Sequence, residues 1–175
     1  MDKFINWTMQ RATPAEAVKL ILVSLVGLIA YGQIKLLVAM FIVQVPPPES
    51  YPEMIGDMII AMIFFIPIPA MAEELLGRML PTLIALLIFS RHRSAILPLM
   101  ILSPLVFALL HALGPMSAIM ALWTYLPLGI VLQVIYLKCG GWKGSGGILT
   151  GLLSCWAVHI VYNWASFASM VLYAQ

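Results

Sequence analysis

Apolar positions fill five long stretches of the chain, at about residues 15–43, 54–90, 95–113, 116–137 and 146–173. Polar and charged positions gather mainly between these stretches. An apolar helix of roughly 20 residues crosses a bilayer core about 30 Å thick, and each stretch reaches about that length. The pattern therefore predicts an all-α protein, a polytopic membrane bundle of about five to six transmembrane or re-entrant helices.

The second stretch, 54–90, is too long for one straight crossing of the membrane. It contains Pro67, Pro69 and Pro81, and each proline removes a backbone hydrogen bond from a helix. We expect the stretch to break into two pieces near residue 70, either as a long kinked helix or with a re-entrant piece.

Short local motifs mark where helices begin and where they pack. The sequence TPAE at 13–16 predicts a capping box with proline at the first helical position, and SYPE at 50–53 repeats the pattern before the second stretch. Gly147 and Gly151, in "GILTG", predict a face of small residues for close helix packing. We expect Lys35 to be an edge charge whose long side chain reaches the membrane interface.

The composition agrees with a membrane protein. Of 175 residues, 63% are hydrophobic and 9% are charged, whereas soluble domains average about 25% charged residues. We expect a single membrane domain over residues 1–175, with 1–14 as an N-terminal interfacial segment. The net charge of +2 gives no reason to expect a nucleic-acid partner, and two cysteines are too few for a disulfide framework.

Positive charges distinguish the two sides of the predicted bundle. They lie before the first stretch, between the second and third, and between the fourth and fifth: Lys3, Arg11, Arg91, Arg93, Lys138 and Lys143. The segment 45–53 carries only negative charges. The positive-inside rule therefore predicts a cytoplasmic N terminus with 45–53 outside, which requires 54–90 to make one net crossing.

Away from its edges, where Asp57 lies, the second stretch carries three charged residues: Glu73, Glu74 and Arg78. Each costs at least about 2.5–3.5 kcal/mol at such a depth. Glu74 and Arg78 are four residues apart and can pair on one helix face. Glu73 lies about 100° further round the helix, and we expect Gly77 to leave open space beside it. This spacing predicts that the Glu74–Arg78 pair is a brace and that Glu73 is free to act. The alternative is a structural ion cluster that joins helices.

Later stretches carry His111, His159 and Asn163. His159 and Asn163 are four residues apart, so both point the same way on a helix. The sequence lacks the paired membrane aspartates of an aspartyl protease, an H-E-x-x-H zinc motif and a serine placed for catalysis. The groups that remain for intramembrane catalysis are a glutamate, a histidine and an oxyanion donor. Hydrogen-bonded core histidines and interhelical polar contacts remain open as alternatives.

A metal site or a carrier function fits the sequence less well. Cys155 lies four residues before His159, so these two residues and His111 could in principle form a metal site. The sequence has no closely spaced set of metal ligands, however. We therefore expect neither a metal nor a cofactor. A carrier or proton relay using Glu73 would be expected to show an inverted repeat, and the sequence shows none.

Three motifs resemble those of one family. "EELLGR" at 73–78 is similar to an EExxxR motif, "FALLH" at 107–111 to FxxxH, and "HIVYN" at 159–163 to HxxxN. They occur in the order typical of the CAAX-processing and bacteriocin-maturation (ABI) family of glutamate intramembrane proteases. The resemblance covers about residues 54–165, a protease-like core. That family usually has an aromatic residue before the arginine and a glycine after it, whereas here Gly77 precedes Arg78 and Met79 follows.

The resemblance implies a mechanism and a class of substrate. Glu73 with His111 would deprotonate a water that attacks a peptide carbonyl, and His159 with Asn163 would stabilise the oxyanion. The substrate would be a membrane-associated peptide or a lipidated protein, such as a CAAX-type protein or a bacteriocin leader. The short chain favours a prokaryotic plasma membrane. Because immunity roles occur in the same family, a non-catalytic immunity or scaffold protein is the alternative. The oligomeric state is not predicted.

Overall fold

The computed structural model describes residues 2–38, 62–89, 92–113 and 118–173, and every regular element in these ranges is a helix. The order is α1 (Asp2–Met9), α2 (Pro14–Val38), α4 (Pro67–Glu74), the π-helix η2 (Leu75–Met79), α5 (Leu80–Ile88), α6 (His92–Leu110), the 3-10 helix η3 (His111–Leu113), α7 (Ala118–Lys138) and α8 (Gly144–Tyr173).

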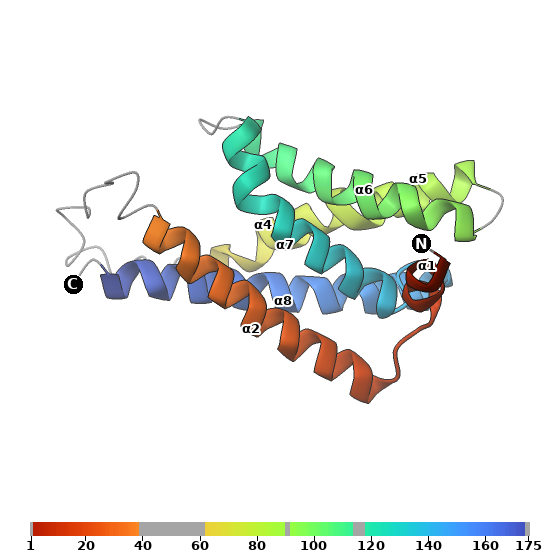
Figure 1. The fold of residues 1–175 in the computed structure, drawn as a ribbon, viewed down its shortest axis with the longest axis horizontal. Coiled ribbons are helices and arrows are strands. Elements are labelled where there is room, and N and C mark those ends of the chain that lie inside the picture. The colour runs from red at the N-terminus through yellow and green to blue at the C-terminus, as the bar shows by residue number, and fades with distance from the viewer. Residues whose placement is uncertain (1, 39–61, 90–91, 114–117, 174–175) are drawn as a thin grey trace.

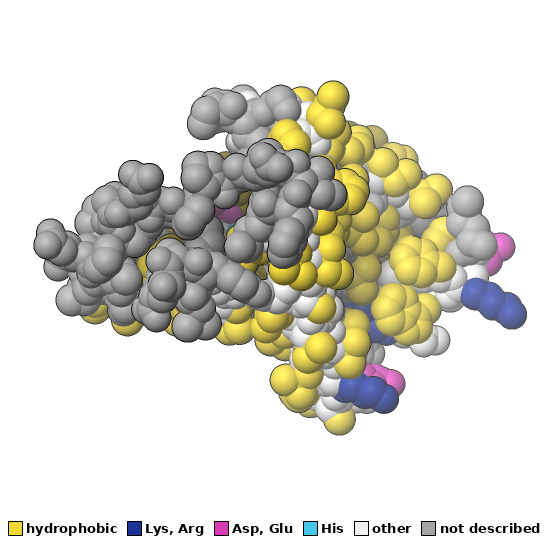
Figure 2. All heavy atoms as spheres, turned by 60° about the vertical axis from the view of Figure 1, so that its left-hand side comes forward, with side chains coloured by type: hydrophobic (Ala, Val, Ile, Leu, Met, Phe, Trp, Pro, Cys, Tyr) yellow, Lys and Arg dark blue, Asp and Glu magenta, His cyan; other side chains and the backbone are white. Residues whose placement is uncertain are grey.

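The predicted helical membrane bundle is confirmed. The described residues contain three helices long and apolar enough to cross a membrane, Pro14–Val38, Ala118–Lys138 and Gly146–Ser169, and a shorter apolar helix at Ala95–Leu110. Hydrophobic side chains cover the middle of the face in Figure 2, and most of the charged side chains visible there lie towards one edge. This is the distribution expected of a protein surrounded by lipid.

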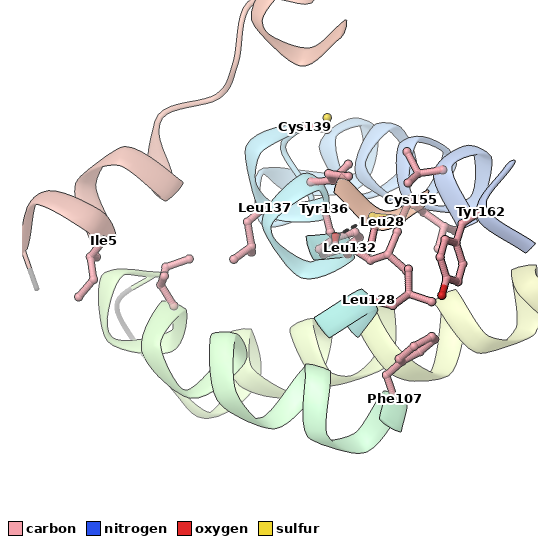
Figure 3. Close-up of a cluster of buried hydrophobic side chains, with 14 residues drawn as sticks. Ile5, Leu28, Phe107, Leu128, Leu132, Tyr136, Leu137, Cys139, Cys155 and Tyr162 are labelled. Atoms are coloured by element: carbon pink, nitrogen blue, oxygen red, sulfur yellow. Dashed lines mark hydrogen bonds between the residues drawn. The ribbon is translucent and has the colours of Figure 1, made fainter. Parts of the chain in front are cut away.

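The core of the bundle is built around α7, which lies between α6 and α8, while α2 crosses the outside of α8 (Figure 1). Side chains of α7 at one-turn intervals form the centre of the main hydrophobic cluster: Leu128, Leu132, Ile135 and Tyr136 (Figure 3). By contrast, Leu28 is the only buried residue of α2. The first helix is therefore peripheral, and its remaining apolar surface is available to lipid.

The start of α2 forms as the sequence predicts. The backbone N–H of Thr13 donates to Glu16 Oε2 at 2.8 Å, and the backbone N–H of Glu16 donates to Thr13 Oγ1 at 3.3 Å. These reciprocal bonds satisfy two donors that a helix end would otherwise leave unpaired. The second predicted capping motif, at 50–53, lies outside the described residues.

The second apolar stretch is interrupted near the predicted position. Regular helix stops at Ile66 and α4 begins at Pro67, whose missing N–H is tolerated at the first position of a helix. After Glu74 the chain widens into the π-helix Leu75–Met79 before α5 follows. The π-helix was not predicted, and such single-turn π segments are frequent at functional sites. Residues 54–61 lie outside the described residues.

A proline in α7 creates one of the contacts between α7 and α2. Pro127 has no N–H to offer the carbonyl of Trp123 four residues earlier. That carbonyl instead accepts a hydrogen bond of 2.5 Å from the hydroxyl of Tyr31, on α2. In a lipid environment a backbone group freed in this way must be satisfied by a neighbouring helix, so Pro127 ties the peripheral helix to the core.

The segments that carry positive charge lie at one end of the bundle. In Figure 1, α1, the end of α5, the start of α6 and the turn after α7 are all at this end. Lys138 holds α1 there, because its Nζ donates to the carbonyls of Trp7 at 2.9 Å and Gln10 at 2.7 Å. From α4 to α5 the chain runs once along the bundle, as one net crossing requires. The cytoplasmic location of this end stays a prediction.

The small-residue face of α8 packs closely, as predicted. A Cβ built on Gly151 would lie 2.7 Å from the carbonyl oxygen of Tyr136 and 2.9 Å from the Cα of Gly141. A Cβ on Gly147 would overlap the carbonyl of Gly140. The two glycines therefore let α8 begin directly against the end of α7 and the turn that follows it.

Replacing Gly151 by alanine is expected to destabilise the bundle by about 1–3 kcal/mol, the usual cost of overpacking, because the new methyl group meets backbone atoms that cannot move aside. Thermal unfolding of the purified protein in detergent measures the change. Gly27→Ala is the matched control, since nothing lies within 4 Å of a Cβ at that position of α2. Equal midpoints for both variants would contradict the close packing at Gly151.

Candidate active site

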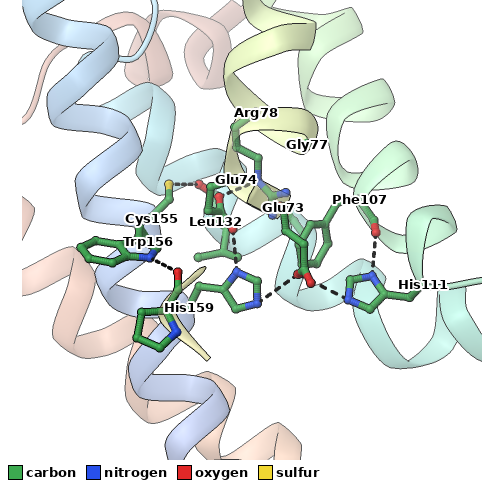
Figure 4. Close-up of polar contacts among 12 residues, drawn as sticks. Glu73, Glu74, Gly77, Arg78, Phe107, His111, Leu132, Cys155, Trp156 and His159 are labelled. Carbon is green, nitrogen blue, oxygen red and sulfur yellow. Dashed lines mark hydrogen bonds and ion pairs between the residues drawn. The ribbon is translucent and has the colours of Figure 1, made fainter. Parts of the chain in front are cut away.

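Three segments that are far apart in the sequence bring polar side chains together in the bundle. Glu73 comes from the end of α4, His111 from the turn after α6, and His159 from the middle of α8 (Figure 4). Glu73 Oε2 lies 3.5 Å from Nε2 of His111 and 3.5 Å from Nε2 of His159. The carboxylate is therefore held between two imidazole rings that belong to different helices.

Glu74 and Arg78 form a fully buried ion pair next to Glu73. The side chains of Glu74 and Arg78 are both 0% exposed, and Glu74 Oε2 is 3.4 Å from Arg78 Nε. Glu74 Oε1 is 2.8 Å from Nδ1 of His159. Arg78 also donates to the carbonyl of Gly129 at 3.4 Å, and its guanidinium lies 4.0 Å from the centre of the Phe107 ring. Glu74 is thus bridged between a fixed cation and the histidine.

The exposure of the side chains separates the two glutamates. The Glu73 side chain is 30% exposed and that of His111 is 19% exposed, whereas that of His159 is only 2% exposed. Among the described members of the cluster, Glu73 and His111 are therefore the most exposed, while Glu74 and Arg78 are fully buried. The pairing of Glu74 with Arg78 that the spacing predicts is present, and Glu73 is the more exposed of the two glutamates.

Gly77 does not leave open space beside Glu73, so that expectation was wrong. A Cβ at Gly77 would already lie 3.4 Å from Cβ and Cδ2 of Phe107, which fills the space. The Phe107 ring also meets His111 and His159 edge-on, at centroid distances of 5.1 and 5.5 Å. The small residue before Arg78 therefore admits an aromatic side chain from α6 into the centre of the site.

The hydrogen bonds of the two histidines fix which ring nitrogen carries hydrogen. Nδ1 of His111 is 2.9 Å from the carbonyl of Phe107, and a carbonyl can only accept, so Nδ1 is the donor. The same argument holds for Nδ1 of His159 if Glu74 is ionised beside Arg78. Both rings then direct Nε2 at Glu73, as an acceptor when neutral and as a donor when protonated.

Other buried polar groups support the site and were missed by the sequence analysis. Ser103 on α6 bonds the carbonyl of Gly77 in the π-helix and lies 2.5 Å from Oε1 of Gln133 on α7. Tyr125 stacks on His111 with ring centres 3.7 Å apart. Ser103 and Gln133 are both fully buried. A polar residue inside an apolar stretch is itself a signal of this kind of role.

Asn163 is the one predicted site residue that the structure does not join to the others. It lies one turn beyond His159 on α8 and is partly buried. In the described part of the chain no hydrogen bond joins it to Glu73, His111 or His159, and it is not among the residues labelled in Figure 4.

The described residues contain no group of three or more His, Cys, Asp and Glu side chains arranged to hold a metal ion. The thiol of Cys155, which the sequence allowed as a ligand, instead donates to the carbonyl of Leu132 at 3.0 Å. The alternative site that combined Cys155 with the histidines is therefore not formed among these residues.

Comparison with known proteins identifies the family. A family model described as type II CAAX prenyl endopeptidase Rce1-like matches residues 55–165, which is more than half of the chain. No curated protein and no solved structure matches the chain. The match includes all the residues that form the polar cluster. The chain therefore belongs to the Rce1-like family of type II CAAX prenyl endopeptidases.

Proposed function

We propose that this protein is an intramembrane endopeptidase that hydrolyses peptide bonds of membrane-associated peptides or lipidated proteins with a water activated by Glu73. The observation that carries the proposal is the position of the Glu73 carboxylate, which is partly exposed and 3.5 Å from Nε2 of both histidines. An ion cluster that served only to join helices would have no need of an accessible, loosely paired carboxylate.

The proposed first step is proton abstraction from water. A distance of 3.5 Å is longer than a direct N–H···O hydrogen bond, whose usual range is about 2.7–3.2 Å, so the Glu73 carboxylate keeps acceptor capacity for a water beside the two rings. Glu73 and His111 would orient one water beside them, and Glu73 would take its proton as the oxygen attacks the peptide carbonyl. Glu73 would then return that proton to the amine nitrogen as the C–N bond breaks. General-base catalysis of this kind contributes about 10²–10⁴-fold.

The proposed second step is stabilisation of the oxyanion by His159 and Asn163. Since Nδ1 of His159 faces Glu74, Nε2 can donate to an oxyanion only while the ring is an imidazolium. Glu74, which is paired with Arg78, lies 2.8 Å from Nδ1 of His159 and would hold the ring in place. Asn163 would approach the oxyanion only with substrate bound. Loss of one such donor typically costs about 10²–10³ in rate.

A non-catalytic immunity or scaffold role in the same family is the second candidate. The observation in its favour is that, among the described residues, no hydrogen bond joins Asn163 to Glu73, His111 or His159. The first motif also departs from the family pattern at Gly77 and Met79. A scaffold of this kind would keep the polar cluster without turning over substrate.

Incubation of the purified protein in detergent with a library of quenched fluorescent peptides, with and without a chelator, tests the proposal. We expect cleavage that is unaffected by the chelator, because the attacking water would be activated by a carboxylate. Cleavage abolished by the chelator would replace the glutamate mechanism with a metal-dependent one. A folded protein that cleaves no peptide in either condition would favour the scaffold role.

A further inference from the structure

A row of polar groups runs along the buried face of α7 that is directed at the π-helix and α5. Gly129, Gln133 and Tyr136 lie four and three residues apart, so they share one face of the helix. At one end of the row, Arg78 of the π-helix donates to the carbonyl of Gly129 at 3.4 Å. At the other end, the hydroxyl of Thr82 on α5 lies next to that of Tyr136. From Gly129 to Tyr136 the row extends about 10.5 Å along the helix axis.

Each polar side chain of this row keeps one atom without a hydrogen-bond partner among the described residues. The atoms are Nη1 of Arg78, Oγ1 of Thr82, Nε2 of Gln133 and the hydroxyl oxygen of Tyr136. All four side chains are fully buried. A polar group buried without a partner is costly, and the lipid around a membrane bundle offers it none. Four such atoms along one contact therefore point to a polar ligand that bonds to them.

Water is the ligand whose chemistry fits this row. The guanidinium and amide N–H groups only donate hydrogen bonds, whereas the two hydroxyl groups both donate and accept. A buried water makes about three hydrogen bonds and takes part in both kinds. At about 2.8 Å between neighbouring oxygens, a row of this length takes roughly three or four waters. A cation would be repelled by the guanidinium of Arg78, and an apolar ligand would leave every one of these atoms unpaired.

The row leads from the buried ion pair to the charged end of the bundle. The Tyr136 ring lies beneath the turn that follows α7, because a Cβ on Gly141 in that turn would overlap the ring. The turn is at the end of the bundle where the segments with positive charge gather (Figure 1). Charged segments of a membrane protein lie at the water interface. The glycine therefore places the Tyr136 hydroxyl between the interior of the bundle and the end that we expect to face water.

We propose that this contact is a binding site for a row of internal water molecules, which bond to the four unpartnered atoms. The waters give the buried guanidinium of Arg78 a partner beyond Glu74 and the carbonyl of Gly129. They thereby lower the cost of burying the ion pair beside the candidate active site. The proposal concerns the support of the polar cluster, so it stands or fails independently of peptide cleavage.

Hydroxyl-radical labelling by X-rays, read by mass spectrometry of the protein in detergent, tests the proposal. Radicals form from bound water inside a protein as well as at its surface, so a buried side chain beside an internal water is oxidised. Tyr136 is 0% exposed, yet we expect its ring to be labelled. Thr82→Val keeps the shape of the side chain and should lower this labelling by about 2- to 10-fold, the effect of one lost hydrogen bond to water. Thr150→Val is the matched control, because Thr150 is exposed and bonds to Gly146 on its own helix.

The unfolding temperature of Tyr136→Phe is a second test. In a dry contact, removing an unpartnered hydroxyl stabilises the protein, whereas in a hydrated row the same change loses a bond to water. We expect the unfolding temperature to fall by about 1–6 °C. Tyr31→Phe, which loses a direct bond to the carbonyl of Trp123, gives the fall for one hydrogen bond as a comparison. The proposal is overturned if Tyr136→Phe unfolds at the same or a higher temperature, if Tyr136 is not labelled in the wild-type protein, or if Thr82→Val leaves the labelling unchanged.

Discussion

Replacing Glu73 by glutamine is expected to lower kcat for peptide cleavage by about 10²–10⁴-fold, the range that general-base catalysis supplies, with an unchanged unfolding temperature. Glutamine has nearly the same shape, but its amide cannot take a proton from water. The side chain is 30% exposed and 3.5 Å from each histidine, so the substitution leaves no buried charge without a partner. Progress curves with a quenched peptide measure the loss.

Glu16→Gln is the control for this substitution. Glu16 lies in the capping box at the far end of α2, and a glutamine there can still accept from the backbone of Thr13. Its activity should equal that of the wild-type protein. If Glu73→Gln retained full kcat, the water would have to be activated by another group, and the proposed mechanism would be wrong. A biological phenotype that survives in Glu73→Gln would favour the scaffold role instead.

The architecture was largely accessible from the sequence because hydrophobic length carries most of the information about a membrane helix. The capping motif at 13–16 predicted the start of α2, and Pro67 marked the interruption of the second stretch within a few residues. The π-helix at Leu75–Met79 could not be read in this way. It depends on tertiary partners, such as Ser103, that satisfy the backbone carbonyl of Gly77.

The polar cluster was accessible from the sequence for a different reason. Charged residues are rare in lipid, so Glu73, Glu74 and Arg78 stood out, and helical spacing predicted the pairing of Glu74 with Arg78. The sequence could not show that Phe107 occupies the space beside Gly77, since that contact joins two helices. The contacts of Asn163 could not be predicted either. The four-residue spacing from His159 places both residues on one helix face, but it does not say which residues of other helices lie opposite that face.

Lys35 and Tyr125 have contacts that sequence motifs and spacing could not predict. A lysine near the end of an apolar stretch usually reaches the interface, yet Lys35 is turned inward by Tyr162 and Thr124, which lie about 90 residues or more away in the sequence. Tyr125 belongs to no motif, although its ring covers His111. Long-range contacts of this kind decide which polar residues of a bundle share one site.

Replacing Arg78 by methionine is expected to destabilise the protein by about 3–5 kcal/mol, the cost of breaking a buried ion pair by removing one partner. Glu74, which is fully buried, would keep its bond to His159 but lose the guanidinium of Arg78. Phe107 and the carbonyl of Gly129 would lose their contacts with the same side chain. Unfolding of the purified protein in detergent measures the loss.

The double variant Glu74→Gln/Arg78→Met separates the charge from the packing. Because replacing both members of a buried pair removes the unpaired charge, the double variant should recover most of the stability that Arg78→Met loses. Its activity should stay low, since the His159 ring would lose the carboxylate that lies 2.8 Å from its Nδ1. A double variant as unstable as Arg78→Met alone would show that the arginine acts through its contacts with Phe107 and Gly129. If the double variant recovered both stability and activity, the Glu74–Arg78 pair would have no role in catalysis.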